Sequence, residues 1–278
     1  MAVTGADSGT RHPAVAPGSD FYYASLYHPA PVREQLRAAA ALRAELLGIP
    51  PGCSDRGVAH VKLAWWHEEL SGTQAPRHDL ARALRPLFEA EPAWRARYLA
   101  LVERLHDALA AAAPADEPAL RAWTDNLHGD FAGPLARLAR PGLAVDDSVL
   151  RELAVDTELL RGVLELRSER RAGPAPFART TLAGHGLSVA SVVEATHTAA
   201  LGALVEAELG ARRSRLAASV AALPRRQRRA ARLPVTLARL ALRAAALTLA
   251  DGAAVLERRV EPTPVAKLVI AWRTCYLG

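Results

Sequence analysis

The chain has 278 residues, of which 50% are hydrophobic, so it is long enough and apolar enough to bury a large core. Its two cysteines, Cys53 and Cys275, lie far apart with no Cys-x-x-Cys spacing, which excludes a disulfide framework and a zinc site of standard pattern. The formal net charge of +6 comes almost wholly from arginine. It favours anionic partners such as lipid headgroups, diphosphates or nucleic acid without choosing among them.

The first nineteen residues are rich in Gly, Pro, Ser, Thr and Ala and contain no apolar core. By composition they are neither a signal peptide nor a membrane anchor, so we expect residues 1–19 to be a disordered tail. Residues 20–278 are expected to form one helical domain. The low cysteine content is typical of a reducing compartment, and we expect a cytoplasmic protein.

Apolar residues recur at helical spacing through most of the chain, for example at Leu99, Val102, Leu105 and Leu109. Strand-like alternation is nearly absent. Gly- and Pro-rich breaks follow one another at 48–52, 71–76, 113–118, 141–147, 173–176, 224 and 262–264. The pattern predicts an all-α fold, a single bundle of about nine to eleven helices joined by short turns.

Two apolar stretches, 189–209 and 235–250, are long enough to suggest a membrane span. The first contains several charged or titratable residues, and the second is interrupted by Arg239 and Arg243. Since a bilayer span needs about twenty mostly apolar residues, both are better interpreted as buried bundle helices.

The most specific motifs lie near the N-terminus. Phe21, Tyr22, Ala24 and Ser25 form a Phe-Tyr-x-Ala-Ser pattern, and residues 61–70 read VKLAWWHEEL. Together with the Leu-Leu-Arg at 159–161 and the LAGHGL at 182–187, they make nearly the whole chain resemble the squalene/phytoene synthase family. The resemblance implies the isoprenoid (terpenoid) synthase fold. It also implies an apolar prenyl cavity and two aspartate-rich motifs that hold a substrate diphosphate through magnesium.

Both aspartate-rich motifs are degenerate here. The resemblance places their aspartates at Leu47 and Pro51 in the first motif and at Gly162 and Leu166 in the second. Magnesium requires hard oxygen ligands in a near-octahedral array, and the glutamates that remain could hold at most one weakly bound ion. We therefore expect no catalytic residue, no metal site and no cofactor, with magnesium needed only if the chain is a divergent enzyme.

The family resemblance also suggests a candidate pocket, lined by Tyr22, Glu45, Trp65, Trp66, Asp107, Arg161 and Glu165. Its ligand would be an apolar isoprenoid or lipid. Adjacent helix residues point about 100° apart, so at least one of Trp65 and Trp66 should lie in the core.

Two smaller patterns have structural interpretations. His60 and His67 lie seven residues apart, whereas metal-bridging pairs prefer the i, i+4 spacing, so a structural or solvent-facing role is expected. Gly129 and Gly133 form a Gly-x-x-x-Gly spacing that would let two helices approach closely. No Gly-x-Ser-x-Gly elbow, Walker loop or dinucleotide fingerprint occurs.

The segment from Leu209 to Ala250 contains no acidic residue, and eight arginines lie between Arg212 and Arg232. A charge run is usually a solvated face, which is the simpler interpretation. The alternative is a membrane-facing basic patch, which would place the protein peripherally at the inner membrane. That patch would consist of Arg225, Arg226, Arg228 and Arg229. Nucleic acid is not expected, because the segment has no interleaved aromatic residues and no recognition module.

Three functions stay open at this point. The first is a non-catalytic prenyl- or lipid-binding or assembly-factor protein, resembling the family branch that includes the mitochondrial complex I assembly factor. The second is a divergent prenyl-diphosphate transferase of carotenoid or hopanoid biosynthesis. The third is the inactive subunit of a hetero-oligomeric synthase, which would require a protein partner. The degenerate motifs favour a role other than catalysis.

Overall fold

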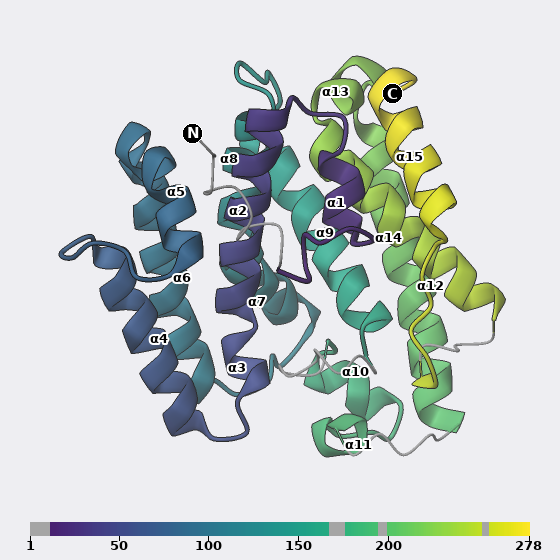
Figure 1. The fold of residues 1–278 in the computed structure, drawn as a ribbon. Helices are drawn as coiled ribbons and strands as arrows, with labels where there is room; N and C mark the ends of the chain where they lie inside the picture. Colours follow the sequence, from purple (N-terminus) through teal and green to yellow (C-terminus); the bar gives the residue numbers. More distant parts are fainter. Residues whose placement is uncertain (1–11, 167–175, 194–198, 252–255) are drawn as a thin grey trace. The chain divides into compact units, whose positions relative to one another are not determined.

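The computed structural model describes residues 12–166, 176–193, 199–251 and 256–278 (Figure 1). These residues form fifteen α-helices and one 3-10 helix, with no strand among them, so the all-α prediction is confirmed. The number of helices exceeds the expected nine to eleven because several are only one or two turns long. The short ones are α1 (Asp20–Ser25), α3 (Ile49–Gly52), α10 (Arg179–Gly184), α11 (Val189–Val193) and α13 (Arg225–Ala230).

The stretch expected to be one domain contains two compact units, each with its own buried core. The first comprises residues 1–111 and 134–143, and the second comprises residues 112–133 and 144–278. The longer helices of the first unit are α2 (Ala30–Leu47), α4 (Arg56–Ser71), α5 (Asp79–Ala90), α6 (Pro92–Ala110) and most of α8 (Ala132–Ala139).

The core of the first unit forms where α2 packs against α5 and α6, and where α4 packs against α6. Leu36, Leu42 and Leu63 are fully buried there, as their helical spacing predicts. Tyr98 is also fully buried, and its hydroxyl donates a 2.8 Å hydrogen bond to the carbonyl oxygen of Ala39. That bond satisfies the one polar atom of a large core side chain.

Residues 12–19 are ordered, so the expectation of a disordered tail is wrong for them. Val15 is buried, the amides of Val15 and Ala16 donate to the carbonyl of His12, and Ser19 caps α1 by accepting from the amide of Tyr22. Composition alone missed this segment because one buried valine and local turns are enough to order a short chain against a core. The rest of the expected tail, 1–11, lies outside the described residues.

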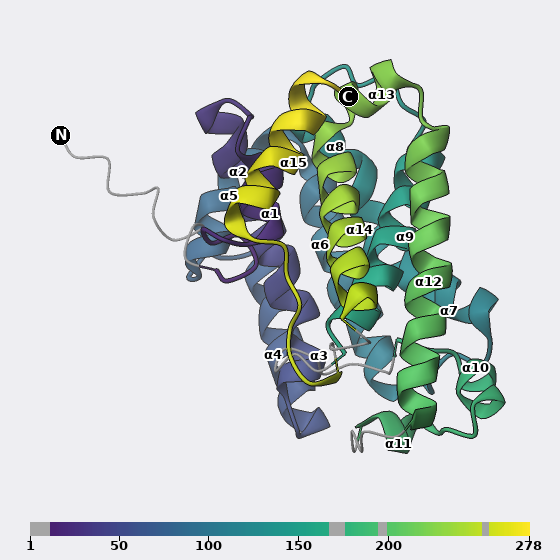
Figure 2. The same ribbon diagram turned by 90° about the vertical axis from the view of Figure 1, so that its right-hand side faces the viewer.

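In the second unit, α9 (Asp147–Leu164) packs against α7, α12 and α14 (Figures 1 and 2). Its buried side chains include Leu150, Leu153 and Leu160. Asp146 starts this helix by accepting a 2.8 Å hydrogen bond from the amide of Ser148. The other elements named here are α7 (Glu117–His128), the 3-10 helix η1 (Gly129–Phe131), α12 (Ala199–Ala222), α14 (Arg232–Ala250) and α15 (Pro264–Tyr276).

Gly129 is the site of a close approach, as the Gly-x-x-x-Gly spacing predicts. A Cβ placed on Gly129 would collide with the side chains of Asp125 and Arg151, which form an ion pair between α7 and α9. The small residue thus lets η1 lie against α9.

Among the described residues, one helix is long and apolar enough to cross a membrane, by length and composition alone. It is α14, and 50% of its most apolar window is buried. Buried core helices satisfy the same criteria, and α14 packs against α9, α12 and α15, as the sequence interpretation expected. Residues 194–198 of the other apolar stretch lie outside the described residues.

Candidate functional site

Glu45, the acidic residue retained near the first motif, lies in the last turn of α2 beside the N-terminal segment. Its Oε2 atom is 3.5 Å from Nε2 of His12. The hydrogen bond from His12 is the main reason that the pKa of Glu45 is lowered; burial opposes it, and the charges of His12, His78 and Lys62 reinforce it. Glu45 therefore already accepts a hydrogen bond from a side chain of the N-terminal segment.

The two aspartate positions of the first motif carry no oxygen ligand. Leu47 is the last residue of α2, and Pro51 lies in the short helix α3 that follows. The break predicted at 48–52 is thus a single helical turn that begins at Ile49 and continues through two prolines, which favour the first turn of a helix.

Trp65 and Trp66 lie on α4 and form one aromatic cluster with His78, the N-cap of α5. Trp66 is buried, which confirms the prediction that at least one of the two belongs to the core. The His78 ring lies 4.7 Å from the ring of Trp66 and 6.2 Å from that of Trp65, centroid to centroid. The guanidinium of Arg77 lies over the half-buried Trp65 ring at 5.5 Å.

Glu69 is a buried carboxylate that the sequence reading did not single out. It accepts hydrogen bonds from the backbone amides of Arg77 and His78, at 2.6 Å and 2.7 Å, and from Nε of Arg77 at 3.3 Å. Burial raises the pKa of Glu69, but these hydrogen bonds and the charge of Arg77 outweigh it, so the pKa is lowered overall. Glu69 thereby fixes the turn that carries His78 onto the tryptophans.

A cavity of about 330 Å³ in the first unit is lined partly by this turn, from Gly72 to Pro76. Glu69, Gly72, Arg85, Phe88 and Arg95 are among the residues that line it. Four of its eleven lining residues are charged (Glu69, Arg85, Glu89 and Arg95), so the cavity is suited to a small polar molecule more than to a prenyl chain.

Two further predicted residues of the first unit, Tyr22 and Asp107, have contacts other than with Trp65, Trp66 and His78. The Tyr22 ring is covered by the guanidinium of Arg37 at 4.6 Å and meets the Tyr23 ring edge-on. Asp107 is exposed on α6, beside His106. These contacts of Tyr22 and Asp107 do not include Glu45.

His60 has its partner on another helix, and not in His67. Its Nδ1 lies 3.0 Å from Nδ1 of His106 on α6, and the two rings are stacked. The pKa of His106 is lowered, first by burial and then by the positive charges of His60 and His67. This pair joins α4 to α6, which agrees with the structural role expected for His60.

The residues of the second motif, at the C-terminal end of α9, pack against neighbouring side chains or form local ion pairs. A Cβ on Gly162 would lie 2.9 Å from Cβ of Pro176, so no aspartate fits at this position without displacing the proline. Leu166, the other aspartate position, is buried. Glu165 accepts a 3.1 Å hydrogen bond from Nη2 of Arg161, whose Nη1 lies 3.6 Å from Glu158. The basic loop that should follow, at 170–174, lies outside the described residues.

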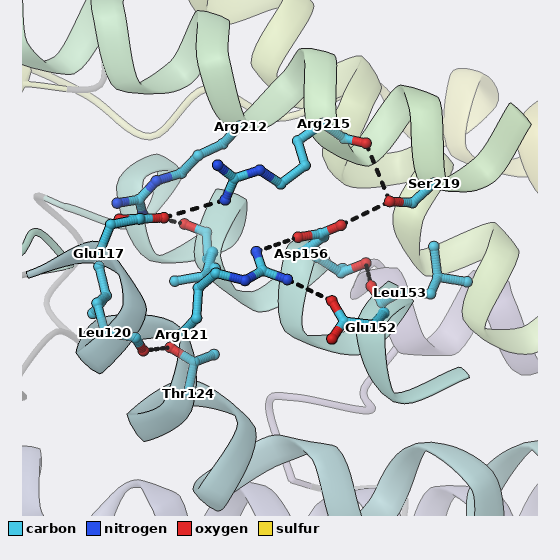
Figure 3. A network of polar contacts seen from close by, with 12 residues as sticks. Glu117, Leu120, Arg121, Thr124, Glu152, Leu153, Asp156, Arg212, Arg215 and Ser219 are labelled. Carbon is cyan, nitrogen blue, oxygen red and sulfur yellow. Dashed lines mark hydrogen bonds and ion pairs between the residues drawn. The ribbon is translucent and has the colours of Figure 1, made fainter. Parts of the chain in front are cut away.

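A polar network that the sequence reading missed joins α7, α9 and α12 (Figure 3). Asp156, buried on α9, accepts 2.7 Å hydrogen bonds from Nη1 of Arg121 and from the hydroxyl of Ser219. Arg121 also donates to Glu152. The only sequence signal was a charged residue, Asp156, at an inward position of an apolar helix.

Arg212 shows that the basic run is not one continuous surface. Its side chain is buried on α12, where Nη1 donates a 2.8 Å hydrogen bond to the carbonyl of Leu159 and Nε donates to Glu208. Arg215 pairs with Glu117 on α7 at 3.2 Å (Figure 3). These two arginines join helices within the second unit, so the solvated-face interpretation does not apply to Arg212.

The donor atoms of the two motifs do not fit a magnesium-bound diphosphate. Leucine, proline and glycine occupy the aspartate positions, Glu45 is paired with His12, and Glu165 is paired with Arg161. Among the described residues, no group of three or more His, Cys, Asp or Glu side chains is arranged to hold a metal ion. Each motif by itself therefore lacks the hard oxygen ligands that magnesium needs.

Comparison with known proteins places the chain in a family. The sequence profile of squalene/phytoene synthase matches residues 14–265. A dehydrosqualene synthase crystallised with a ligand is 16% identical, with a TM-score of 0.66 over 92% of this chain and 90% of its own. TcSQS in complex with a ligand is 14% identical, with a TM-score of 0.70 over 95% and 84%. Squalene synthase HpnC from Alicyclobacillus acidocaldarius is 16% identical, with a TM-score of 0.58 over 84% and 88%.

No functionally curated protein matches the chain at a significant level. The helices and the structural neighbours define a protein of the isoprenoid synthase fold. The chain belongs to the squalene/phytoene synthase family, as the match over residues 14–265 shows.

Proposed function

We propose that this protein is a non-catalytic member of its family that binds an apolar isoprenoid or lipid. The observation that carries the proposal is the second motif, where Gly162 is closed off by Pro176 and Leu166 is buried. At these two positions the chain has exchanged metal ligands for packing.

The chemistry of the family explains why that exchange matters. Ionisation of an allylic diphosphate leaves concentrated negative charge, which must be neutralised in the transition state. On α9 both carboxylates near the motif, Glu158 and Glu165, lie beside Arg161, and on α2 Glu45 is held by His12. A carboxylate that is already paired with a donor side chain is a poorer ligand for a divalent ion. We therefore infer that no magnesium-dependent prenyl coupling takes place.

Binding of an apolar molecule requires no metal-coordinating carboxylates. The structural neighbours include synthases that were crystallised in complex with ligands, which supports an isoprenoid as the ligand class. In the first unit, the half-buried Trp65 offers an indole face next to His78. We assign Trp65 to the ligand and Trp66 to the core.

Ligand-dependent thermal stabilisation tests this proposal. Farnesol, geranylgeraniol and longer polyprenols should raise the melting temperature of the intact chain, since a ligand at a hundred times its Kd stabilises by about 2.7 kcal/mol. Trp65→Ala should reduce the effect at least about tenfold in apparent Kd, which corresponds to about 1.4 kcal/mol.

Trp123→Ala is the matched control, because Trp123 is likewise a half-buried tryptophan but belongs to α7 of the second unit. It should leave ligand binding unchanged. An absence of any shift with all polyprenols, or an equal loss in both variants, would contradict the assignment.

A further inference from the structure

The C-terminal helix α15 exposes apolar side chains and buries polar ones. Val265, Val269 and Trp272 are 70%, 47% and 46% exposed, whereas Lys267 and Thr274 are buried. This is the reverse of the arrangement expected for a helix on the surface of a water-soluble protein. It indicates that the outward face of α15 meets something other than water.

The inward face of α15 is fixed by polar contacts, so the helix cannot simply rotate. Nη1 of Arg239 on α14 donates a 2.9 Å hydrogen bond to the hydroxyl of Thr274. Nζ of Lys267 lies 3.1 Å from Glu261. A rotation of α15 that turned the apolar stripe inward would break both of these contacts and separate Lys267 from Glu261.

The exposed apolar side chains are concentrated on this one helix. Of the nine large hydrophobic residues that are exposed in the described part of the chain, six belong to α15 or its C-cap. Val265, Leu268, Val269, Trp272 and Tyr276 follow the i, i+3, i+4, i+7, i+11 spacing of a single helix face. A patch of this kind marks a contact surface.

The short basic helix α13 adjoins the C-terminal end of this stripe (Figure 2). Nε of Arg225 donates a 2.8 Å hydrogen bond to the carbonyl oxygen of Leu277, which ties the two elements together. Arg226 and Arg229 on the same short helix are exposed. The pKa of Arg239 is lowered, first by burial and then by the charges of Arg228 and Arg273, so positive charge converges here from α13 and α15.

Two acidic residues that precede α15 in the sequence already form ion pairs. Glu261 precedes the helix and pairs with Lys267 and Arg259. Asp251 pairs with Arg258. Together, α13 and the C-terminal half of α15 therefore combine exposed arginines with an aromatic and aliphatic stripe. The sequence contains no acidic residue between 209 and 250.

We propose that α13 and the outward stripe of α15 form a docking surface for an anionic lipid membrane. Tryptophan and tyrosine are suited to the headgroup region, aliphatic side chains to the acyl boundary, and arginines to acidic headgroups. A helix that lies in the plane of the interface and is anchored to the protein by its polar inner face satisfies all of these preferences at once. This surface is independent of the ligand proposed above.

Sedimentation with vesicles tests the proposal with the full chain. The protein should pellet with vesicles of phosphatidylcholine containing about 30% phosphatidylglycerol, and not with phosphatidylcholine alone. Arg226→Gln with Arg229→Gln should weaken binding about thirtyfold, as expected for two basic residues near an anionic surface. Trp272→Ala with Tyr276→Ala should weaken it more than about tenfold. Arg225 and Arg228 are left intact because both donate to backbone carbonyls.

Matched controls separate this surface from general charge and general hydrophobicity. Arg56→Gln with Arg213→Gln removes the same charge from exposed positions elsewhere, and Val61→Ser removes an exposed valine on α4. Both should bind vesicles almost as the wild type does. Brominated lipids should quench part of the wild-type tryptophan fluorescence, and the quenching should disappear in Trp272→Phe.

Three results would overturn the proposal. The first is equal binding to neutral and anionic vesicles, and the second is undiminished binding by both double variants. The third is a concentration-dependent dimer that Trp272→Ala with Tyr276→Ala dissociates, without vesicle binding, which would assign the stripe to a second copy of the chain.

Discussion

At the scale of single residues, the side chains at the two degenerate motifs take part in local contacts. Glu45 binds His12, Glu165 binds Arg161, and Gly162 makes room for Pro176. Glu69 shows the structural counterpart, since one buried carboxylate accepts two backbone amides and a guanidinium and so shapes the turn before α5.

Glu69→Ala should therefore destabilise the protein by about 3 kcal/mol, because two backbone amides lose their acceptor inside the fold. Its effect should depend on pH. The lowered pKa of Glu69 means that its contribution is complete above the pKa of an unfolded glutamate and is lost as the pH falls through the folded value. Urea unfolding at neutral and acidic pH measures both.

Glu68→Ala is the control, because the neighbouring Glu68 is 53% exposed and only approaches Arg77, at 3.8 Å. It should change the free energy of unfolding by less than about 0.5 kcal/mol. Equal losses in the two variants would show that Glu69 does not hold the turn.

At the scale of helices, α9 is the element on which the second unit depends. Asp156 links it to Arg121 on α7 and to Ser219 on α12 (Figure 3). A buried carboxylate that is fully hydrogen-bonded specifies how helices pair, and removing its charge leaves Arg121 with a weaker partner.

Asp156→Asn should lower the free energy of unfolding by about 2 kcal/mol, because the amide can accept from only one of the two donors with comparable strength. Glu152→Gln should change it by less than about 0.5 kcal/mol, since Glu152 binds the same arginine but is 67% exposed. Urea denaturation of the two variants decides the matter. A larger loss in Glu152→Gln would contradict the role given to Asp156.

The sequence predicts the helices and their core well where one face of a helix is apolar, as in α6 and α9, and it predicts that at least one of Trp65 and Trp66 lies in the core, without saying which. It could not predict contacts that depend on distant segments. The approach of His12 to Glu45 and of Pro176 to Gly162 requires the chain to fold back over loops whose path no periodicity encodes. The outward orientation of α15 was equally hidden, because its sequence is apolar on one face and gives no sign of which face is covered.

At the scale of the whole molecule, the family match and the helical fold establish the family of the chain. Its activity depends on the residues at the two motifs. Motif resemblance predicted the family, which the match over residues 14–265 confirms. It did not decide the activity, because a fold can be kept while its site changes. The packing at Gly162 and Leu166 is the feature that bears most directly on activity.

Release of diphosphate is the measurement that tests the central claim most directly. The purified chain is incubated with farnesyl or geranylgeranyl diphosphate and magnesium, beside a heat-inactivated sample, a chelator-treated sample and Glu165→Ala. The loss of oxygen ligands at Leu47, Pro51, Gly162 and Leu166 predicts no release above the heat-inactivated sample in any of them. Release that magnesium supports, and that both the chelator and Glu165→Ala abolish, would contradict the account.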